Sequence, residues 1–558
     1  MVFYTKYIAN KKGFALFLVF CSALLIVACQ KKDFNTKDVY ENNATTDVSF
    51  TADAPQPVTV SEGTIVKYGI KGLRSKAAGT YKFYINEMEA TIQEVADTYI
   101  SVRIPLNASS GSASLVFNNG QICYGPGITV RGNTQIATDF ISNIGTNKAL
   151  KAGRAATAVI TGITLMPNGN YLVYGDFDQY GNAIDLSNIT SGIQMIDATG
   201  KALETSKQLA MGKRGLNGTI NDAKILSDGG ILLSGSFSKY DTIENVNGVA
   251  RFFNDGTFDL TEYEVANSDP ETHPENNTRP GSSINGGTLG SILSTFLDNA
   301  GNYITVGNYR AFSSVYYPNS TVESLQLDMI TSLGLTKMDS YGVFDSSFNY
   351  KYETRQSYQG ANGFVLSAVQ LNSGHLLLGG TFTTFHGSNA QRLVCIDPVS
   401  GMQSNVFSGS TDGPVFRITH NKTTGSLILL GNFKHYNGIP VNGMVVVKED
   451  GSINTGVALK AIEGGVVTYA AQLNDGRYMI SGSFSKYDNI VRSGFAILNS
   501  NGSLATGYNN TGLFRGFING HAELNTFNGV ALLLVGNFDR FDNKEMGNIV
   551  KVILTNTQ

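Results

Sequence analysis

The 558-residue sequence contains no tryptophan, only six histidines and four cysteines, and few charged residues, which make up 15% of the chain. A typical globular protein has about 25% charged residues. Asp and Glu (44) nearly balance Lys and Arg (41), which leaves a formal net charge of −3. Such a composition lacks the basic surface that binds a phosphate backbone. We therefore expect no nucleic-acid partner.

The cysteines are too few and too scattered for a disulfide scaffold. Cys21 and Cys29 lie in the first 30 residues, while Cys123 and Cys395 stand 272 positions apart. Small disulfide-stabilised domains instead carry several closely spaced cysteines. We interpret Cys123 and Cys395 as small buried side chains.

Motifs of common catalytic and metal sites are also missing. The chain has no His-Glu-x-x-His, Gly-x-Ser-x-Gly, Walker or Rossmann pattern, and His-Ala-Glu-Leu-Asn at 521–525 lacks the second zinc ligand. We expect no catalytic residue, metal or cofactor. The histidines are dispersed, which favours exposed loop positions over a shared site. They are His273, His375, His386, His420, His435 and His521.

The longest apolar run lies near the N-terminus. Residues 13–28 are apolar, follow three lysines and are shorter than the ~20 residues of a membrane-spanning helix, which is typical of a secretion signal. The run ends in Leu25-Ile26-Val27-Ala28-Cys29, which resembles a bacterial lipobox. The resemblance implies that Cys29 is acylated and becomes the mature N-terminus. The alternative is an ordinary signal peptide with an incidental cysteine.

The first 47 residues are thus expected to be a signal peptide (1–28) followed by a flexible polar tether (29–47). Removing the signal peptide removes three lysines and no acid, so the mature net charge is −6. Acyl chains rather than basic side chains would hold such a chain to a membrane. The sequence Gln30-Lys31-Lys32-Asp33 resembles the signal that sends lipoproteins of Bacteroidetes-type bacteria to the outer face of the outer membrane. We expect a lipid-anchored protein facing the cell exterior.

Residues 48–132 alternate short β-branched or aromatic runs with turn residues. About seven short strands in this length predict an antiparallel β-sandwich. The sequences Gly69-Ile70-Lys71-Gly72, Phe83-Tyr84-Ile85-Asn86 and Ile100-Ser101-Val102-Arg103-Ile104-Pro105 resemble the immunoglobulin-like IPT/TIG family. The resemblance implies a rigid spacer, and we assign no site to it.

Glycine is abundant, and it marks a repeat. The motif Gly-x-[Phe/Tyr]-x-x-[Phe/Tyr] occurs seven times at spacings of 60, 72, 73, 51, 51 and 54 residues, and the octapeptide 234–241 recurs identically at 481–488. The anchor glycines are Gly175, Gly235, Gly307, Gly380, Gly431, Gly482 and Gly536. Each motif closes a strand that follows another strand and a turn, often Asp-Gly, which is a strong hairpin signal. Each repeat therefore predicts a sheet of about four antiparallel strands.

Such sheets cannot cover both of their faces alone, and radial stacking solves this. The sequence therefore predicts a seven-bladed β-propeller over residues 133–558. We interpret the motif aromatics as inter-blade packing, with a stacked ligand platform as the alternative, and the motif glycine as a point of close backbone approach. The repeat resembles the delta-60 propeller type, and the whole layout resembles uncharacterised surface proteins of Bacteroidetes glycan-utilisation systems.

The seventh repeat lacks room for a fourth strand, because only four residues follow 547–554. An open edge would leave unpaired backbone groups. Just before the first repeat, Thr138-Asp-Phe-Ile-Ser-Asn143 resembles the missing strand. We predict that residues near 135–145 pair with 547–554 and hold the N-terminal unit beside the seventh blade.

Two insertions, Thr261–Gly287 and Ser313–Ser340, account for the wide spacings. Loops on a rigid scaffold usually carry binding specificity. Tyr316 and Tyr317 are candidates for stacking on a sugar ring, with covering of a blade edge as the alternative. His386 and His435 complete the candidate glycan-binding residues.

The hypothesis that follows is a non-catalytic surface lipoprotein that binds a polysaccharide or oligosaccharide through its propeller, within a polysaccharide-utilisation system. The lack of tryptophan counts against it, although 26 tyrosines and 31 phenylalanines can serve as platforms. Two alternatives stay open: a propeller polysaccharide lyase or hydrolase, and a protein-interaction scaffold of an outer-membrane import complex.

Overall fold

The computed structural model describes residues 47–140, 146–147, 158–181, 191–203, 215–527 and 529–556. Apart from the short 3-10 helices η1 (Leu73–Ser75) and η2 (Tyr317–Asn319), all regular structure in these ranges is β-sheet. The predicted all-β class is confirmed. None of the described residues forms a helix with the length and apolarity that crossing a membrane requires. Cys29 lies outside the described residues.

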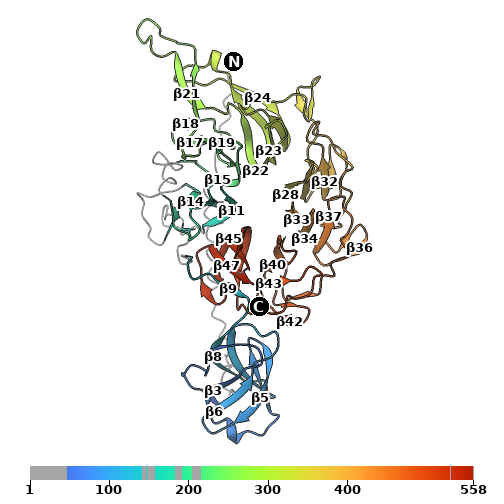
Figure 1. The fold of residues 1–558 in the computed structure, drawn as a ribbon. Coiled ribbons are helices and arrows are strands. Elements are labelled where there is room, and N and C mark those ends of the chain that lie inside the picture. The colour runs from blue at the N-terminus through green and yellow to red at the C-terminus, as the bar shows by residue number, and fades with distance from the viewer. Residues whose placement is uncertain are drawn as a thin grey trace, which may run out of the picture.

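The N-terminal unit is one eight-stranded sheet around a single apolar core (Figure 1). Its strand order is β1-β3-β6-β5-β4-β7-β8-β2, antiparallel except between β2 and β8. Alternating side chains of β3 and β4 point into this core, where the rings of Phe50, Tyr68 and Phe83 meet. The strands are β1 (Ser49–Phe50), β2 (Thr59–Val60), β3 (Ile65–Lys71), β4 (Tyr81–Ile85), β5 (Met88–Val95), β6 (Tyr99–Arg103), β7 (Gly111–Phe117) and β8 (Ile122–Val130).

The rest of the described chain forms a β-propeller-like domain of consecutive antiparallel sheets, which we number as repeats one to seven (Figure 1). The first strand of each repeat contacts the first strand of the next, and β44 contacts β11, so these contacts close a ring. The three main strands of each repeat are β11 (Val159–Leu165), β12 (Tyr171–Asp176) and β14 (Ile193–Ile196); β15 (Thr219–Ile225), β16 (Ile231–Ser236) and β19 (Val249–Phe252); β22 (Gly287–Leu297), β23 (Tyr303–Val315) and β25 (Leu335–Met338); β28 (Val365–Gln370), β29 (Leu376–Gly380) and β32 (Leu393–Ile396); β33 (Val415–Asn421), β34 (Ser426–Gly431) and β37 (Met444–Lys448); β39 (Val467–Gln472), β40 (Tyr478–Gly482) and β43 (Phe495–Leu498); and β44 (Arg515–Thr526), β45 (Gly529–Phe541) and β47 (Ile549–Thr555).

The fourth strand expected in each repeat is much reduced. In repeats one to six it is a single bridge, as between Phe252 and Phe258 or Leu498 and Leu504, because the chain then leaves for the next repeat. In every repeat except the third, short two-residue strands lie at or directly after the end of the motif. They are β13 (Gln179–Tyr180), which pairs with β10 (Thr146–Asn147); β17 (Lys239–Tyr240) and β18 (Ile243–Glu244); β30 (Thr384–Phe385) and β31 (Ser388–Asn389); β35 (His435–Tyr436) and β36 (Ile439–Pro440); β41 (Lys486–Tyr487), which pairs with β42 (Ile490–Val491) and β38 (Ile462–Glu463); and β46 (Lys544–Glu545).

The motif residues have the predicted roles. A Cβ on any of the seven anchor glycines would lie 2.0–2.2 Å from a carbonyl oxygen of the neighbouring first strand or the residue before it, so only glycine fits. The motif aromatics pack against the preceding repeat: Phe484 and Tyr487 join Ile428 and Leu430 in one core. Tyr487 also donates a 2.6 Å hydrogen bond to a turn carbonyl of its own repeat. The predicted inter-blade packing is confirmed.

The ends of the domain are joined as predicted. β9 (Thr134–Ile136) adds antiparallel to β47, with Ile136 opposite Val552. The pairing covers 134–136 and one further bond at Ala137, earlier than the expected 138–143 segment. Phe140 is buried in the adjoining core, and residues 141–143 lie outside the described ranges.

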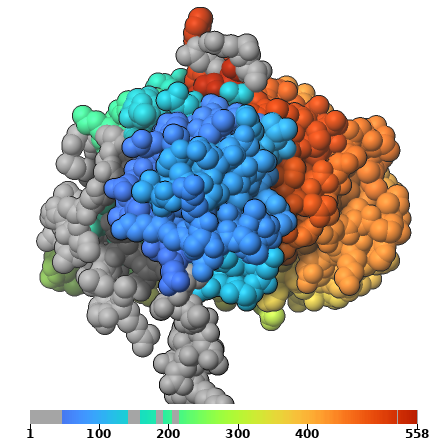
Figure 2. All heavy atoms as spheres, turned by 90° about the horizontal axis from the view of Figure 1, so that it is seen from below, coloured from blue at the N-terminus to red at the C-terminus, as the bar shows by residue number. Residues whose placement is uncertain are grey.

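The N-terminal unit rests against repeats six and seven, as Figure 2 shows from below. The Ser110 backbone N–H donates to the Asn510 carbonyl at 2.9 Å. The Asn510 side chain donates to the carbonyls of Val130 and Thr134. The two units are therefore joined by hydrogen bonds, and Asn510 binds the chain on both sides of the connecting residues 131–133.

Candidate functional site

The two predicted insertions fold together into one projection beside repeat three. The first forms the hairpin β20 (Leu260–Glu264) and β21 (Thr278–Ser282), and the second extends β23 so that it pairs with β24 (Leu327–Thr331). The Arg279 guanidinium donates to the Val322 carbonyl at 2.5 Å, which ties the two together.

This projection separates the roles of Tyr316 and Tyr317. Tyr317 stacks on Tyr263 of the first insertion, with centroids 3.8 Å apart and planes 5° from parallel. One face of its ring is therefore used inside the protein, and burial raises the pKa of its hydroxyl. Tyr316 is 50% exposed, and no aromatic ring of the described residues packs against it. Only Tyr316 keeps the free face that was expected of both.

A cleft of about 770 Å³ lies beside the second insertion, within the usual size range of ligand pockets. Its lining includes Phe312 and Ile330 of the extended hairpin and Phe344 of the segment after β25. The rings of Phe312 and Phe344 are 5.2 Å apart, and Tyr350 meets Phe344 edge-on at 5.3 Å. These contacts build an apolar, aromatic base.

The turn between β26 (Tyr350–Lys351) and β27 (Gln356–Ser357) supplies the rest of the lining. It brings Tyr352, Glu353 and Arg355 to the cleft, and Asp328 of β24 also lines it. Tyr352 is 81% exposed, so its ring is open to a ligand. Aromatic faces combined with two carboxylates and a guanidinium can stack on a flat apolar surface and hydrogen-bond hydroxyl groups.

A second cleft of about 730 Å³ lies between repeats two and three. The tight turn 339–343 divides the two clefts: Ser340 and Tyr341 line the second, while Gly342 and Val343 line the first. Gly342 has a φ of +85°, and a Cβ there would lie 2.6 Å from the Gly286 nitrogen. The turn is thus packed closely against the segment just before β22, and Tyr341 is 70% exposed beside the clefts.

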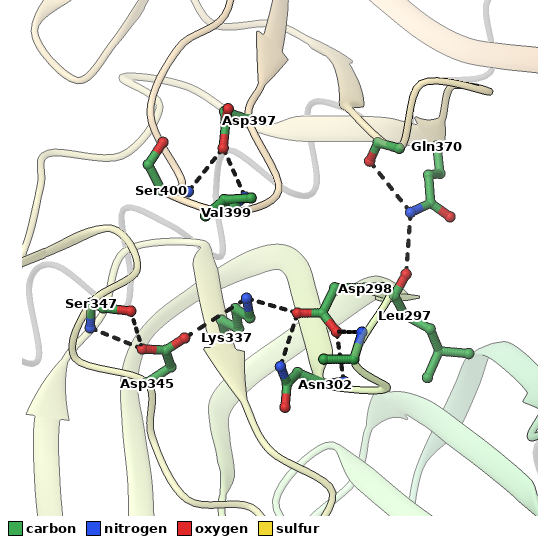
Figure 3. Close-up of polar contacts among 12 residues, drawn as sticks. Leu297, Asp298, Asn302, Lys337, Asp345, Ser347, Gln370, Asp397, Val399 and Ser400 are labelled. Carbon is green, nitrogen blue, oxygen red and sulfur yellow. Dashed lines mark hydrogen bonds and ion pairs between the residues drawn. The ribbon is translucent and has the colours of Figure 1, made fainter.

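Charged groups shape the second cleft. The Arg251 guanidinium lies between the carboxylates of Asp228 and Asp259. On the other side, Lys337 Nζ is 2.7 Å from Asp298 and 3.8 Å from Asp345 (Figure 3). Burial alone would raise the pKa of Asp298, but hydrogen bonds from Lys337 and Asn302 outweigh it, and the pKa is lowered. The Asp298 carboxylate, which lines this cleft, is therefore ionised at neutral pH.

The predicted histidines lie outside both clefts. His386 has a φ of +52° in a two-residue turn, where other repeats carry Asn437, Asp488 or Asp542. Histidine tolerates this left-handed conformation better than most residues. Its ring packs on Phe385, and burial lowers its pKa to about 4. It serves the turn.

His435 is exposed and pairs with Asp412 at 2.7 Å, close to the turn that follows its motif. His420 and His521 do not occupy the expected exposed loops. They lie on the first strands β33 and β44. The side chain of His420 is 4% exposed, and His521 Nδ1 lies 2.7 Å from the Tyr469 hydroxyl, with which it shares a hydrogen bond. Burial lowers the pKa of both histidines. The first strands are packed on both sides by neighbouring repeats, which explains this burial.

Sequence reasoning did not single out Asp328, Tyr350, Tyr352, Glu353 and Arg355. Asp328 lies within the insertion Ser313–Ser340, for which the sequence analysis expects a role in binding specificity. The other four follow that insertion and have no periodic pattern. A signal was present in Tyr350-Lys-Tyr352-Glu353-Thr-Arg355, where aromatic and charged residues alternate.

Comparisons with known proteins cover two parts of the chain. Residues 25–126 match a domain of unknown function, DUF5008. Residues 226–261 and 473–507 match a second one, the DUF5122 beta-propeller. The second match falls on repeats two and six and agrees with the propeller-like fold. No curated protein matches the chain.

Solved structures match over most of the chain at low similarity. An auxiliary nutrient binding protein from Bacteroides ovatus is 11% identical over 90% of this chain and 97% of its own, with a TM-score of 0.28. One from Bacteroides thetaiotaomicron is 10% identical over 91% and 98%, with a TM-score of 0.30. The rhamnogalacturonan lyase YesW is 12% identical over 91% and 90%, with a TM-score of 0.26. Similarity at this level carries no argument about this chain's function.

Proposed function

We propose that this protein is a non-catalytic cell-surface lipoprotein that binds a glycan at the cleft beside repeat three. The cleft itself is the observation that carries the proposal: about 770 Å³, with the exposed Tyr352 beside Asp328, Glu353 and Arg355. A sugar ring offers an apolar face to an aromatic platform and hydroxyl groups to charged neighbours. Conformationally rigid aromatics are efficient contacts of this kind.

The second cleft supports binding of a glycan chain rather than a single sugar. It lies on the other side of the turn that carries Tyr341, and its lining adds Asp228, Arg251 and Asp259. Carboxylates outnumber cations along both clefts. This balance favours a neutral, hydroxyl-rich polymer over a polyanionic one.

Around this site we propose the following layout. A closed seven-bladed propeller (133–558) is the binding head, an immunoglobulin-like IPT/TIG sandwich (48–132) is the spacer, and 29–47 is the tether. Acyl chains on Cys29 anchor the protein in the outer membrane, facing the exterior, within a polysaccharide-uptake system. The charge and apolar pattern of residues 1–33 supports this anchor.

Glycan-array or affinity-gel binding tests the function. Tyr352→Ala is expected to weaken binding about 10-fold, or roughly 1.4 kcal/mol. Tyr124→Ala is the matched control, because Tyr124 is 76% exposed on β8 of the N-terminal unit. Equal affinities of wild type and Tyr352→Ala, or no glycan bound, would contradict the proposal. New reducing ends on a bound glycan would favour the lyase or hydrolase alternative. Capture of import-complex proteins in the absence of glycan binding would favour the scaffold alternative.

The anchor is tested by Cys29→Ala with metabolic lipid labelling. The variant is expected to lose the lipid label and to stay unprocessed, because the cysteine thiol is the acylated group. Normal labelling of the variant would contradict the anchor.

A further inference from the structure

The joint between the N-terminal unit and the ring encloses a cavity of about 200 Å³. In Figure 1 the N-terminal unit lies at the opposite end of the ring from β24. The lining of the cavity comes from both units: Glu62, Asn107 and Arg131 from the N-terminal side, and Arg492 and Asn510 from repeat six and its following loop. Whatever binds here therefore contacts both units at once.

Arg492 is the unusual residue of this cavity. It is only 2% exposed, and its Nη1 donates to the carbonyls of Asn107 (3.1 Å) and Val491 (2.5 Å). Its Nε and Nη2 have no hydrogen-bond partner within the described part of the chain. These two groups form one edge of the guanidinium plane, the edge that binds both oxygens of a carboxylate or phosphate.

The charge around Arg492 is incompletely balanced. Glu62 is the acid that lines the cavity, and its carboxylate already accepts a 3.0 Å bond from the Asn107 N–H. Arg131 adds a second cation to the lining. Burial lowers the pKa of Arg492 to about 10, so it stays charged at neutral pH. A buried cation with an unused bidentate edge is costly unless an anion meets it.

We propose that this cavity binds a small oxyanion, a phosphate, sulfate or carboxylate group, through the Nε and Nη2 edge of Arg492 with Arg131 as a second contact. Because Asn107 holds the other side of the same guanidinium, the bound anion also stabilises the docking of the N-terminal unit on the ring. This inference is independent of the glycan proposal.

Thermal unfolding of the whole protein in phosphate, sulfate or acetate tests it, with chloride at matched ionic strength as the reference. The oxyanions are expected to raise the Tm saturably by about 1–3 °C, because they bind the folded state only. If phosphate and sulfate raise the Tm and acetate does not, the ligand is a free inorganic ion. If acetate also raises the Tm, the ligand can be a carboxylate group. Equal effects of chloride and all three oxyanions would overturn the proposal.

Variants show whether Arg492 is the cause. Arg492→Lys keeps the charge but lacks the bidentate edge, so it is expected to lose the saturable rise. Arg515→Lys is the control, since that exposed arginine pairs with Asp539 elsewhere, and it keeps the rise. If Arg492→Lys does not fold, two other variants test the site. Arg131→Ala is expected to lower the affinity for the anion at least about 3-fold, and Glu62→Gln is expected to raise that affinity by a similar factor. Unchanged affinity in both, or an unchanged response in Arg492→Lys, would overturn the proposal.

Discussion

Repeats four to six and repeats two and three solve the same packing problem in different ways. In the regular repeats the anchor glycines are 51 residues apart, whereas insertions widen the spacing to 72 and 73 around repeats two and three. In each of these repeats the carbonyl of one third-strand residue accepts a hydrogen bond from a backbone N–H of the segment that follows the strand, and this bond identifies an equivalent position. It holds Cys395, Val446 and Ile497 in repeats four, five and six, but Arg251 and Lys337 in repeats two and three.

The two groups of repeats differ in the kind of side chain that occupies this buried position. Val446 and Ile497 are 2% and 0% exposed and need only apolar neighbours. Lys337, at 8% exposed, instead requires Asp298 and Asp345 on either side, because a buried charge must be paired. The apolar version closes the surface between repeats, while the charged version leaves a polar cleft. The regular repeats thus act as scaffold, and the irregular ones carry the candidate site.

The largest expected effect is in a regular repeat. Phe484→Ala should destabilise the ring by about 3–5 kcal/mol, because the ring of Phe484 is 1% exposed in the core between repeats five and six. Chemical denaturation measures this change. Phe527→Ala, at a fully exposed phenylalanine, is the control and should change stability by less than about 0.5 kcal/mol. Similar small losses in both would mean that the motif aromatics are not the inter-repeat core.

The next effect sharpens the comparison at the charged position. Lys337→Met should cost about 3 kcal/mol at pH 7, because it leaves Asp298 partly buried without its cation. Lys239→Met, an exposed lysine 2.7 Å from Glu244, is the control and should cost less than about 0.5 kcal/mol. Tolerance of Lys337→Met would mean that repeat three accepts the apolar solution of repeats five and six unchanged.

The same pair predicts a change in the pH dependence. In the wild type the pKa of Asp298 is lowered, so its stabilisation is present above the unfolded pKa and is lost as pH falls through the folded one. In Lys337→Met burial and the hydrogen bonds from Asn302 remain while the cation is gone, so the pKa of Asp298 rises relative to the wild type and this stabilisation weakens. Denaturation between about pH 3 and 6 should therefore show a smaller loss of stability on acidification in the variant than in the wild type. Parallel pH profiles would contradict the assigned pairing.

The smallest effects lie in the insertions. Tyr317→Ala should cost about 1 kcal/mol, because it removes the stacked partner of Tyr263. Tyr316→Ala, one residue earlier and half exposed, should change stability by less than about 0.5 kcal/mol. Thermal unfolding of the two variants side by side measures the difference. Equal losses would place both tyrosines in one structural role.

The repeat architecture was predictable because its determinants are local and recur. Every copy of the repeat carries a glycine followed by two aromatic residues. The glycine is required because a Cβ at its position would lie 2.0–2.2 Å from a carbonyl oxygen. The joining of the ends was predictable for a similar reason, since a missing strand leaves an unpaired edge. The register was less predictable: β9 pairs at 134–136, at the start of the predicted stretch near 135–145, because backbone pairing says little about which neighbouring residues fit best.

By itself the sequence determined the all-β class, the recurring sheets, the packing of the motif aromatics and the positions of the two insertions. Only the tertiary structure decided which insertion residues face a cleft, that Tyr317 stacks inside the projection, and that His386 serves a turn. The physical reason is that a repeat is written in neighbouring residues. A cleft joins Phe312, Asp328 and Tyr352, and an anion cavity joins Arg131 and Arg492, across distances in the chain that carry no pattern.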